Sequence, residues 1–305
     1  MSQTIQGALP LPHLGIIQVE GDDAASFLHG QLTQDFALLG LQEARLAGFC
    51  SAKGRLQASF VGFKRSANQI FLVCPRDLLP QTLKRLSMFV LRAKAKLSDV
   101  TADYQIWGVI GPQVRASGLP IGQPWAKVDQ AEVTWVSLYP AFEQARALLV
   151  APREADVGLQ ANLSVEDWAL SEVHSGIAWV SAPVFEAFVP QMLNYESVGG
   201  VNFKKGCYPG QEVVARSQFR GTLKRRTYLV RSQQALQVGA EVFEASDLSQ
   251  PCGTVVQVAL TPTGCDALVS MTISAAGGAV YSQAQATPEA QLELLPLPYA
   301  LLEDI

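Results

Sequence analysis

The chain has 305 residues, of which 49% are hydrophobic and only 16% are charged, so it can bury large cores in two or three domains. Its formal net charge of −4 argues against a nucleic-acid-coating protein and against direct nucleic-acid binding. The sequence contains no apolar run of membrane-spanning length, and residues 1–15 lack the pattern of a secretory signal. We therefore expect a cytoplasmic protein without a membrane segment.

The cysteines and histidines show no spacing that is typical of a metal site. None of the five cysteines forms a Cys-x-x-Cys pair, and their odd number argues against a disulfide framework. The three histidines are isolated from one another along the sequence. We expect no metal site made by this chain alone. The cysteines are Cys50, Cys74, Cys207, Cys252 and Cys265.

The first hundred residues alternate between predicted strands and helices. Apolar, β-branched runs predict four strands, two of which form a hairpin around a turn at 51–54. Apolar residues at helical spacing predict a short helix that begins near Asp22 or Asp23. They also predict an amphipathic helix over 77–92. In that helix Leu79, Leu83, Leu86, Phe89 and Val90 are expected to face inward. The strands are expected at 14–20, 43–50, 55–63 and 70–74.

The middle of the chain continues the mixed pattern. Strands are expected at 105–110, 133–138 and 147–150, with a turn-rich loop at 118–126. Hairpins, rather than repeated strand–helix–strand units, indicate the α+β class. A capping box, Ser-Val-Glu-Asp at 164–167, predicts the start of a helix that runs to about Ser175.

The composition changes after Arg226. From residue 227 to the end there are one basic and eight acidic residues. Short apolar, β-branched runs separated by turns predict a small β-barrel. These runs lie at 228–230, 241–243, 253–258 and 267–271.

The stretch 199–216, GGVNFKKGCYPGQEVVAR, places a cysteine in a turn before a helix. Glycines and a proline bracket Cys207, and a helix is predicted over 211–218, with Pro209 well placed at its start. Exposed N–H groups and the dipole at a helix N-terminus favour a thiolate. Cys207 is therefore a candidate functional thiol, although many single cysteines are simply core residues.

Two further features suggest a ligand. Seven basic residues and one acid lie between Lys204 and Arg226, which indicates a local anion site or, equally simply, a solvated face. Trp168 could stack on a flat heteroaromatic ligand whose anionic tail would seek arginine or lysine. Core packing is the simpler interpretation of Trp168.

The cysteine stretch resembles the signature of a known family. Residues 205–212, KGCYPGQE, followed by Arg216, are similar to the motif of the YgfZ family of folate-binding proteins. That family is related to the aminomethyltransferase (T-protein) of the glycine cleavage system and to a mitochondrial iron–sulfur assembly factor. Supporting similarities lie at GQLTQD (30–35), AKGR (52–55), LPLPY (295–299) and the residues Pro190, Asn194 and Gly200.

The resemblance implies a three-domain ring like that of the T-protein. It consists of two α+β (ferredoxin-like) domains and a C-terminal β-barrel. The domain that holds the folate site is expected at 1–100, completed by 155–225. The second domain is expected at 101–154, and the barrel at 226–305.

The resemblance also implies a ligand and a set of site residues. Tetrahydrofolate would bind near the central opening, and Cys207 corresponds to the cysteine that the family requires for function. Leu14 stands where the family has a second tryptophan. The residues expected to bind folate are Trp168, Lys205, Arg216 and Asn194.

Three functions remain open from the sequence. The resemblance implies a folate-dependent accessory protein that maintains iron–sulfur enzymes and supports tRNA thiolation, with those enzymes as partners. An aminomethyltransferase of the glycine cleavage type is an alternative, although those enzymes lack the Lys-Gly-Cys-Tyr motif. A non-catalytic tRNA-binding module is the third, against which the net charge argues. Whether Cys207 turns over a substrate stays open.

Overall fold

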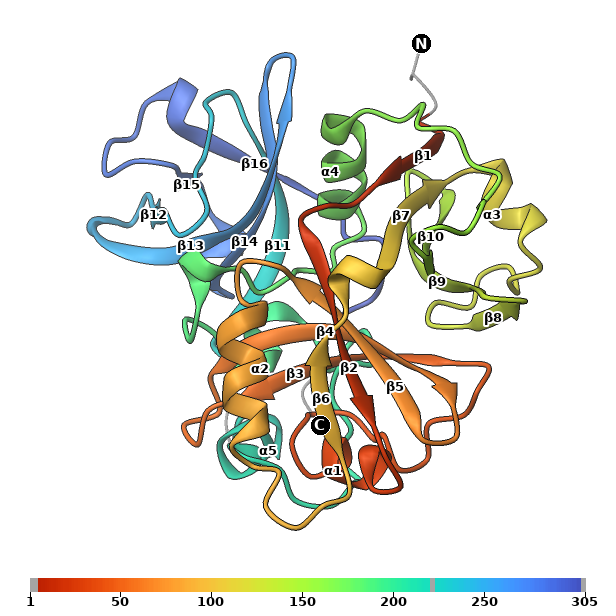
Figure 1. Cartoon of the computed structure of the whole chain (residues 1–305). Helices are drawn as coiled ribbons and strands as arrows, with labels where there is room; N and C mark the ends of the chain where they lie inside the picture. Colours follow the sequence, from red (N-terminus) through yellow and green to blue (C-terminus); the bar gives the residue numbers. More distant parts are fainter. Residues whose placement is uncertain (1–4, 220–222, 303–305) are drawn as a thin grey trace.

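The computed structural model of the chain describes residues 5–219 and 223–302. Within these ranges the strands form two five-stranded sheets and one closed six-stranded barrel. The three units form three lobes around a common junction, with the barrel at the upper left of Figure 1. This architecture confirms the predicted α+β class with a C-terminal barrel. No helix in the described ranges has the length and apolar character needed to span a bilayer.

The first sheet has the order β3-β4-β5-β2-β6, and all of its neighbouring strands are antiparallel. The hairpin predicted around residues 51–54 joins β3 to β4. Helices α1 (Ala24–His29) and α2 (Leu79–Ser87) follow β2 and β5. The strands are β2 (Leu14–Glu20), β3 (Ala44–Cys50), β4 (Leu56–Ser66), β5 (Gln69–Pro75) and β6 (Lys96–Asp99).

Helix α2 is shorter than the sequence predicts. It ends at Ser87, because the following backbone N–H groups of Phe89 and Val90 bond three residues back and tighten the chain into turns. Phe89 is 39% exposed, although its ring meets Phe49 edge-on. The prediction that the helix reaches residue 92 with Phe89 facing inward is therefore wrong.

The second sheet has the order β1-β7-β10-β9-β8. Strand β1 comes from the beginning of the chain and pairs with β7, about one hundred residues later in the sequence. The helix predicted from the capping box is α4 (Val165–His174), and the Ser164 hydroxyl accepts a hydrogen bond from the Asp167 N–H at 3.0 Å. The remaining elements are β1 (Gly7–Pro10), β7 (Tyr104–Ile110), α3 (Pro112–Ala116), β8 (Lys127–Gln130), β9 (Val133–Ala141) and β10 (Gln144–Pro152).

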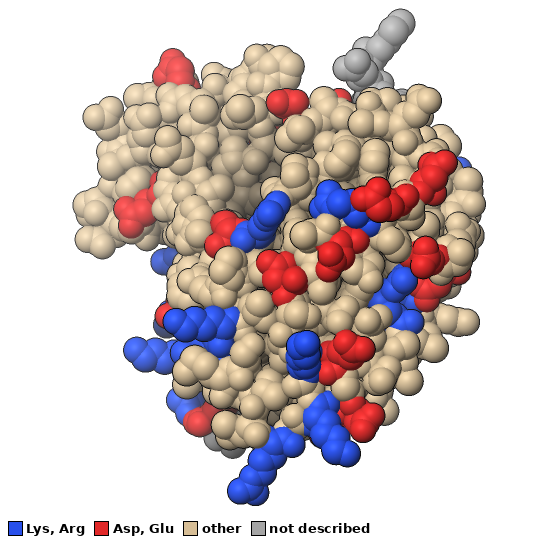
Figure 2. Space-filling view, in the orientation of Figure 1, with Lys and Arg blue, Asp and Glu red and all other residues tan. Residues whose placement is uncertain are grey.

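The barrel contains the four predicted runs and two short strands that the sequence did not reveal, β15 and β16. Figure 2 shows few Lys or Arg side chains on this lobe, in keeping with its acidic composition. Its strands are β11 (Arg225–Ser232), β12 (Glu241–Glu244), β13 (Asp247–Thr261), β14 (Gly264–Thr272), β15 (Val280–Tyr281) and β16 (Gln291–Leu295). The other helices are α5 (Gln211–Phe219) and the 3₁₀ turns Thr101–Asp103, Ala182–Val184, Pro190–Leu193, Ala275–Gly277 and Pro288–Ala290.

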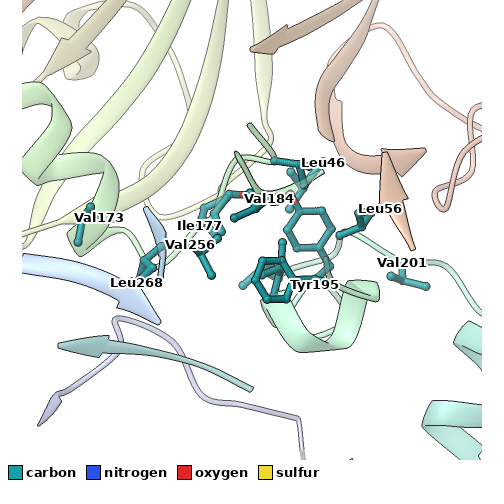
Figure 3. Close-up of a cluster of buried hydrophobic side chains, with 14 of the residues drawn as sticks. Leu46, Leu56, Val173, Ile177, Val184, Tyr195, Val201, Val256 and Leu268 are labelled. Carbon is teal, nitrogen blue, oxygen red and sulfur yellow. Dashed lines mark hydrogen bonds between the residues drawn. The ribbon is translucent and has the colours of Figure 1, made fainter. Parts of the chain in front are cut away.

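A buried apolar cluster fills the junction between the lobes. Figure 3 shows Leu56 of the first sheet, Val173 of α4 and Val256 of the barrel in this cluster, with Tyr195 among them. Tyr195 is fully buried, and its hydroxyl donates a hydrogen bond of 2.7 Å to the carbonyl oxygen of Ala178. The three lobes therefore share a packed core and are not independent domains joined by linkers.

A charged cluster also ties α4 to the barrel. His174 Nε2 lies 2.7 Å from Asp266 Oδ2, and Arg231 makes a two-pronged ion pair with the same carboxylate. Burial by itself raises the pKa of Asp266, but the hydrogen bonds from His174 and Arg231 outweigh it and lower the pKa to about 2. The ionised carboxylate is thus stabilised in the folded state.

Replacing Asp266 by asparagine should make the stability less dependent on pH in acid. Because the folded-state pKa is depressed, the carboxylate contributes stability above its unfolded pKa of about 4 and loses it as the pH falls through about 2. Urea unfolding of the wild type and of Asp266→Asn between these pH values checks this. Asp156→Asn, at an exposed position, is the control. Parallel pH curves for the wild type and Asp266→Asn would contradict the assignment.

Candidate functional site

Cys207 lies on an exposed loop just before α5. The other four cysteines are buried, and none of the five is in a disulfide. Helix α5 begins at Gln211, so Pro209 lies in the turn before the helix rather than in its first turn. Cys207 therefore lies outside any helix or strand, as expected, but in an irregular stretch between the turns at 203–204 and 209–210, where solvent and partners can reach the thiol.

The side chain of Lys205 anchors this loop to the body of the protein. Its ammonium group donates hydrogen bonds to the carbonyl oxygens of His29 and, at 2.9 Å, of Leu32, and lies 4.6 Å from the ring centre of Tyr208. The residue is only 8% exposed. Burial lowers the pKa of Lys205 to about 8, although Asp35 and Cys207 favour the charged form. Lys205 thus joins the loop to the end of α1.

The segment 30–35 fixes the start of the same loop. The Thr33 hydroxyl donates to the carbonyl oxygen of Gly200 at 2.6 Å, and the Gln34 amide donates to that of Gly199 at 2.7 Å. The Asn202 N–H in turn donates to the carbonyl oxygen of Thr33 at 2.9 Å. Three hydrogen bonds therefore position the segment 199–202, which leads to Cys207.

The turn at 51–54 fixes the end of the loop. Gly54 and Gly210 both have a positive φ, and they are packed against each other. A Cβ atom at Gly210 would lie 2.4 Å from the carbonyl oxygen of Ser51 and 2.7 Å from the Cα of Gly54. Only glycine allows this approach of two backbones. The segments 30–35 and 52–55 are far from Cys207 in the sequence, yet both brace its loop.

A histidine–aspartate pair, which the sequence did not reveal, adjoins the loop. His29 Nδ1 lies 3.0 Å from Asp35 Oδ1, and the Leu38 N–H donates to the same oxygen at 2.9 Å. Burial alone raises the pKa of Asp35, but the hydrogen bonds from Leu38 and His29 outweigh it and lower the pKa. A Cβ atom at Gly206 would lie 3.2 Å from His29 Nε2. The sequence signal for this pair was only that His29 directly precedes the segment 30–35 and that Asp35 ends it.

Trp168 lies in a core rather than at an open surface. It is 1% exposed, and it packs on Gly108, where an added Cβ atom would lie 2.8 Å from the indole ring. The guanidinium carbon of Arg146 lies 4.5 Å from the ring centre. Neither Trp168 Nε1 nor Arg146 Nη2 has a hydrogen-bond partner among the described residues. Core packing, the simpler interpretation of Trp168, describes its position in this structure.

Asn194 joins the 3₁₀ turn at 190–193 to the barrel. It is fully buried in a left-handed conformation with φ of 59°. Its amide donates to the carbonyl oxygen of Thr227 at 2.8 Å and to the hydroxyl of Tyr299 at 3.3 Å. The Thr227 N–H donates back to Asn194 Oδ1 at 3.2 Å. Both polar ends of the side chain are therefore engaged within the protein.

Arg216 lies on the outer surface of α5, and its guanidinium pairs with Glu212 one turn earlier at 2.5 Å. Arg216 and Lys205 are close to Cys207 in the sequence. Trp168 and Asn194, in contrast, make separate buried contacts elsewhere in the structure. Trp168 lies in a buried core, Asn194 bonds the barrel and Arg216 lies at the surface, so the residues expected to bind folate have different surroundings. Their role in folate binding stays a prediction.

The basic stretch 204–226 is also divided. Arg226 forms a buried ion pair with Glu196 at 2.5 Å, and its Nη2 donates to the carbonyl oxygen of Leu302. Lys204 and Lys224 are exposed, whereas Arg220 lies outside the described residues. The described residues therefore do not support one continuous anion site along this stretch.

Comparisons with known proteins test the family that the cysteine motif predicts. No family profile matches the chain. The tRNA-modifying protein YgfZ of Edwardsiella ictaluri is 30% identical over 303 residues, which cover 93% of this chain and 89% of that protein. The chain belongs to the YgfZ family. The YgfZ of Cronobacter sakazakii is 28% identical, with 97% of this chain and 93% of that protein covered. The family predicted from the cysteine motif is thereby confirmed.

A solved structure extends the comparison from the sequence to the fold. The glycine cleavage system aminomethyltransferase T from Bartonella henselae superposes with a TM-score of 0.69 at 16% sequence identity. The match covers 98% of this chain and 87% of that protein. At this identity the match establishes the fold alone, and it confirms the predicted three-domain arrangement of the T-protein type.

Among residues 5–219 and 223–302, no three His, Cys, Asp or Glu side chains lie together as candidate ligands for one metal ion. What the site offers chemically is an exposed thiol on a loop that is braced at its start, middle and end. Such a thiol can act as a nucleophile or as a ligand toward a group carried by another molecule.

Proposed function

We propose that this chain is a folate-binding accessory protein that maintains iron–sulfur enzymes and supports tRNA modification by thiolation. One observation carries the proposal: the two distant segments that resemble the YgfZ pattern, 30–35 and 52–55, both brace the loop that exposes Cys207. A chain that only needed a stable fold would not require a solvent-facing thiol at the point where these segments meet.

The comparisons support the tRNA link. Relatives from several bacteria carry the name tRNA-modifying protein, and their similarity extends along most of this chain. The exposed position of Cys207 suits contact with another macromolecule better than catalysis in a closed pocket, because an exposed loop leaves reactive intermediates open to water. We therefore propose that the Cys207 thiol contacts a partner enzyme rather than a free small molecule.

Folate binding requires a site that is accessible to the ligand, and the four predicted residues do not form one together. Trp168 is buried, and Asn194 has both polar ends engaged, so we derive no chemical step through a folate held by this set. The junction of the lobes contains aromatic and polar residues, including Trp125, Arg146 and Trp179, around a cavity of about 20 Å³ that would have to widen to admit a folate. A folate site at the junction is consistent with the central position that the family resemblance implies.

Expression of this chain in a bacterium that lacks its own YgfZ should restore thiolated nucleosides in tRNA, as measured by mass spectrometry of digested tRNA. The proposal fails if a folded, well-expressed chain leaves the thiolated nucleosides at the level of the deletion strain. Release of ammonia from an aminomethyl-loaded carrier protein would instead support the glycine-cleavage activity. Steeply salt-dependent binding of purified tRNA would support the tRNA-binding module.

A further inference from the structure

The end of helix α2 leaves a group of apolar side chains on the surface of the first lobe. Met88 is 63% exposed and Leu91 is 86% exposed. Phe89 lies between them in the chain, and its half-exposed ring meets Phe49 edge-on at a centroid distance of 6.4 Å. Single apolar residues on a surface need no explanation, but a contiguous group is typical of an interaction site.

A cavity of about 70 Å³ adjoins this apolar group. Two aromatic residues line it, Phe49 and the exposed Phe185, together with Gln81, Thr82 and Arg85 of α2. Its volume is far below the roughly 300–1,000 Å³ that is typical of small-molecule sites. The cavity therefore suits one side chain of a docked macromolecule better than a free ligand.

The same cavity contains a buried acceptor without a partner. Gln57 lines the cavity and is only 6% exposed. Its Nε2 donates to Glu186 Oε1 at 2.6 Å, but its Oε1 has no hydrogen-bond partner among the described residues. An unpaired buried acceptor is destabilising, and a donor brought by a partner removes that cost. The cavity thus favours a side chain with an apolar body and a donor at its end, which describes tyrosine and tryptophan.

Positive charge accompanies the apolar group and the cavity. Lys84, Arg85 and Arg92 are exposed, and none of them makes an ion pair among the described residues. Such free cations favour a partner with acidic side chains, because complementary charges steer two proteins into register. The phosphates of an RNA would also meet the cations, but they would leave the apolar side chains uncovered and the cavity unfilled. A protein partner therefore fits the whole surface better.

One hairpin connects this surface to the Cys207 loop. Phe49 lies near the end of β3 and Gln57 near the start of β4, on either side of the turn at 51–54. The same turn packs against Gly210 of the loop. A partner that is seated on the surface therefore contacts the hairpin that braces the thiol.

We propose that this surface docks the partner protein that meets the Cys207 thiol. A tyrosine or tryptophan of the partner enters the cavity, packs against Phe49 and Phe185, and donates to Gln57 Oε1. Acidic residues beside it pair with Arg85 and the neighbouring cations. The inference rests on the proposed function and adds the chemistry by which the partner is recognised.

Restoration of thiolated tRNA in a strain without its own YgfZ tests the surface in cells. The docking variant combines Arg85→Glu with Leu91→Ser, both at exposed positions, so its thermal unfolding midpoint should match that of the wild type. It should lower the thiolated nucleosides by roughly tenfold or more, because a reversed charge and a lost apolar contact both weaken binding. The matched control makes the same two exchanges at exposed positions of the other lobes, Arg115→Glu and Leu260→Ser, and should restore thiolation fully.

A labelled peptide that carries one tryptophan between glutamates measures the docking directly, by fluorescence anisotropy. The wild type and the matched control should bind it. The docking variant should bind it at least about tenfold more weakly, and so should the wild type when alanine replaces the tryptophan of the peptide.

The outcomes separate the docking surface from the proposed function. If the wild type and the docking variant restore thiolation equally well, the inference is overturned and the proposed function stands. If the wild type restores nothing, the proposed function falls, and the peptide decides the surface: equal binding by both proteins, or no binding, overturns it. Salt-dependent binding of purified tRNA that only the docking variant loses would assign the surface to RNA. A wild-type dimer that the docking variant cannot form in sedimentation would assign it to a second copy of this chain, and either result overturns the inference.

Discussion

Cys207→Ser is expected to abolish the restoration of thiolated tRNA in a strain without its own YgfZ, while the protein remains folded. Serine has nearly the same size but is a far weaker nucleophile and metal ligand than a thiolate. Cys207 is exposed and makes none of the described hydrogen bonds, so the substitution breaks no hydrogen bond. The readouts are the thiolated nucleosides in tRNA and the thermal unfolding midpoint of the purified variant.

A cysteine in the barrel supplies the control for this experiment. Cys252→Ala changes a side chain that is 8% exposed and far along the chain from the braced loop. It should cost some stability and keep the ability to restore tRNA thiolation. If the Cys207 variant restored thiolation as well as the Cys252 variant does, the thiol would have no part in the function, and the case for a reactive loop would collapse.

Gly210→Ala is expected to destabilise the protein by about 3 kcal/mol and to impair function although Cys207 is untouched. A left-handed backbone costs a residue with a Cβ about 1–2 kcal/mol. In addition, the new Cβ would lie 2.4 Å from the carbonyl oxygen of Ser51, so the two turns must separate. Denaturant unfolding measures the loss, and the tRNA readout shows whether the loop still works.

The chain offers a matched control for the backbone penalty. Gly122 has φ of +72°, close to the +81° of Gly210, but a Cβ atom there would meet no atom within 4 Å. Gly122→Ala should therefore cost only the backbone penalty and leave function intact. Equal losses of stability in the two variants would mean that the contact between the turns at 51–54 and 209–210 contributes nothing.

Much of the fold could be predicted because its signals are local. The apolar, β-branched runs of β2, β5 and the barrel strands appear directly in the sequence, and the Ser164 capping box marked the start of α4. Strand β1 could not be predicted, because its four residues, GALP, include a glycine and a proline and owe their extended form to pairing with β7. Tertiary pairing, not propensity, made this strand.

The site was predictable only in part, for a related reason. The turn around Cys207 follows from its glycines and proline, which act locally. Whether the ammonium group of Lys205 points to solvent or into the protein depends on the carbonyl groups of His29 and Leu32, which lie 176 and 173 residues away in the sequence. The close approach of His29 to Gly206 is likewise a product of the assembled fold.

The braces of the Cys207 loop have a consequence for the newly made protein. The segments 29–35 and 51–54 leave the ribosome long before Cys207 does, and Asn194 bonds barrel residues that are made later still. During translation both bracing segments are therefore already made when Cys207 leaves the ribosome. A chain that stops before the barrel lacks the strands that anchor Asn194. The bracing contacts of the loop therefore come from residues made before Cys207, whereas the anchoring of Asn194 waits for the barrel.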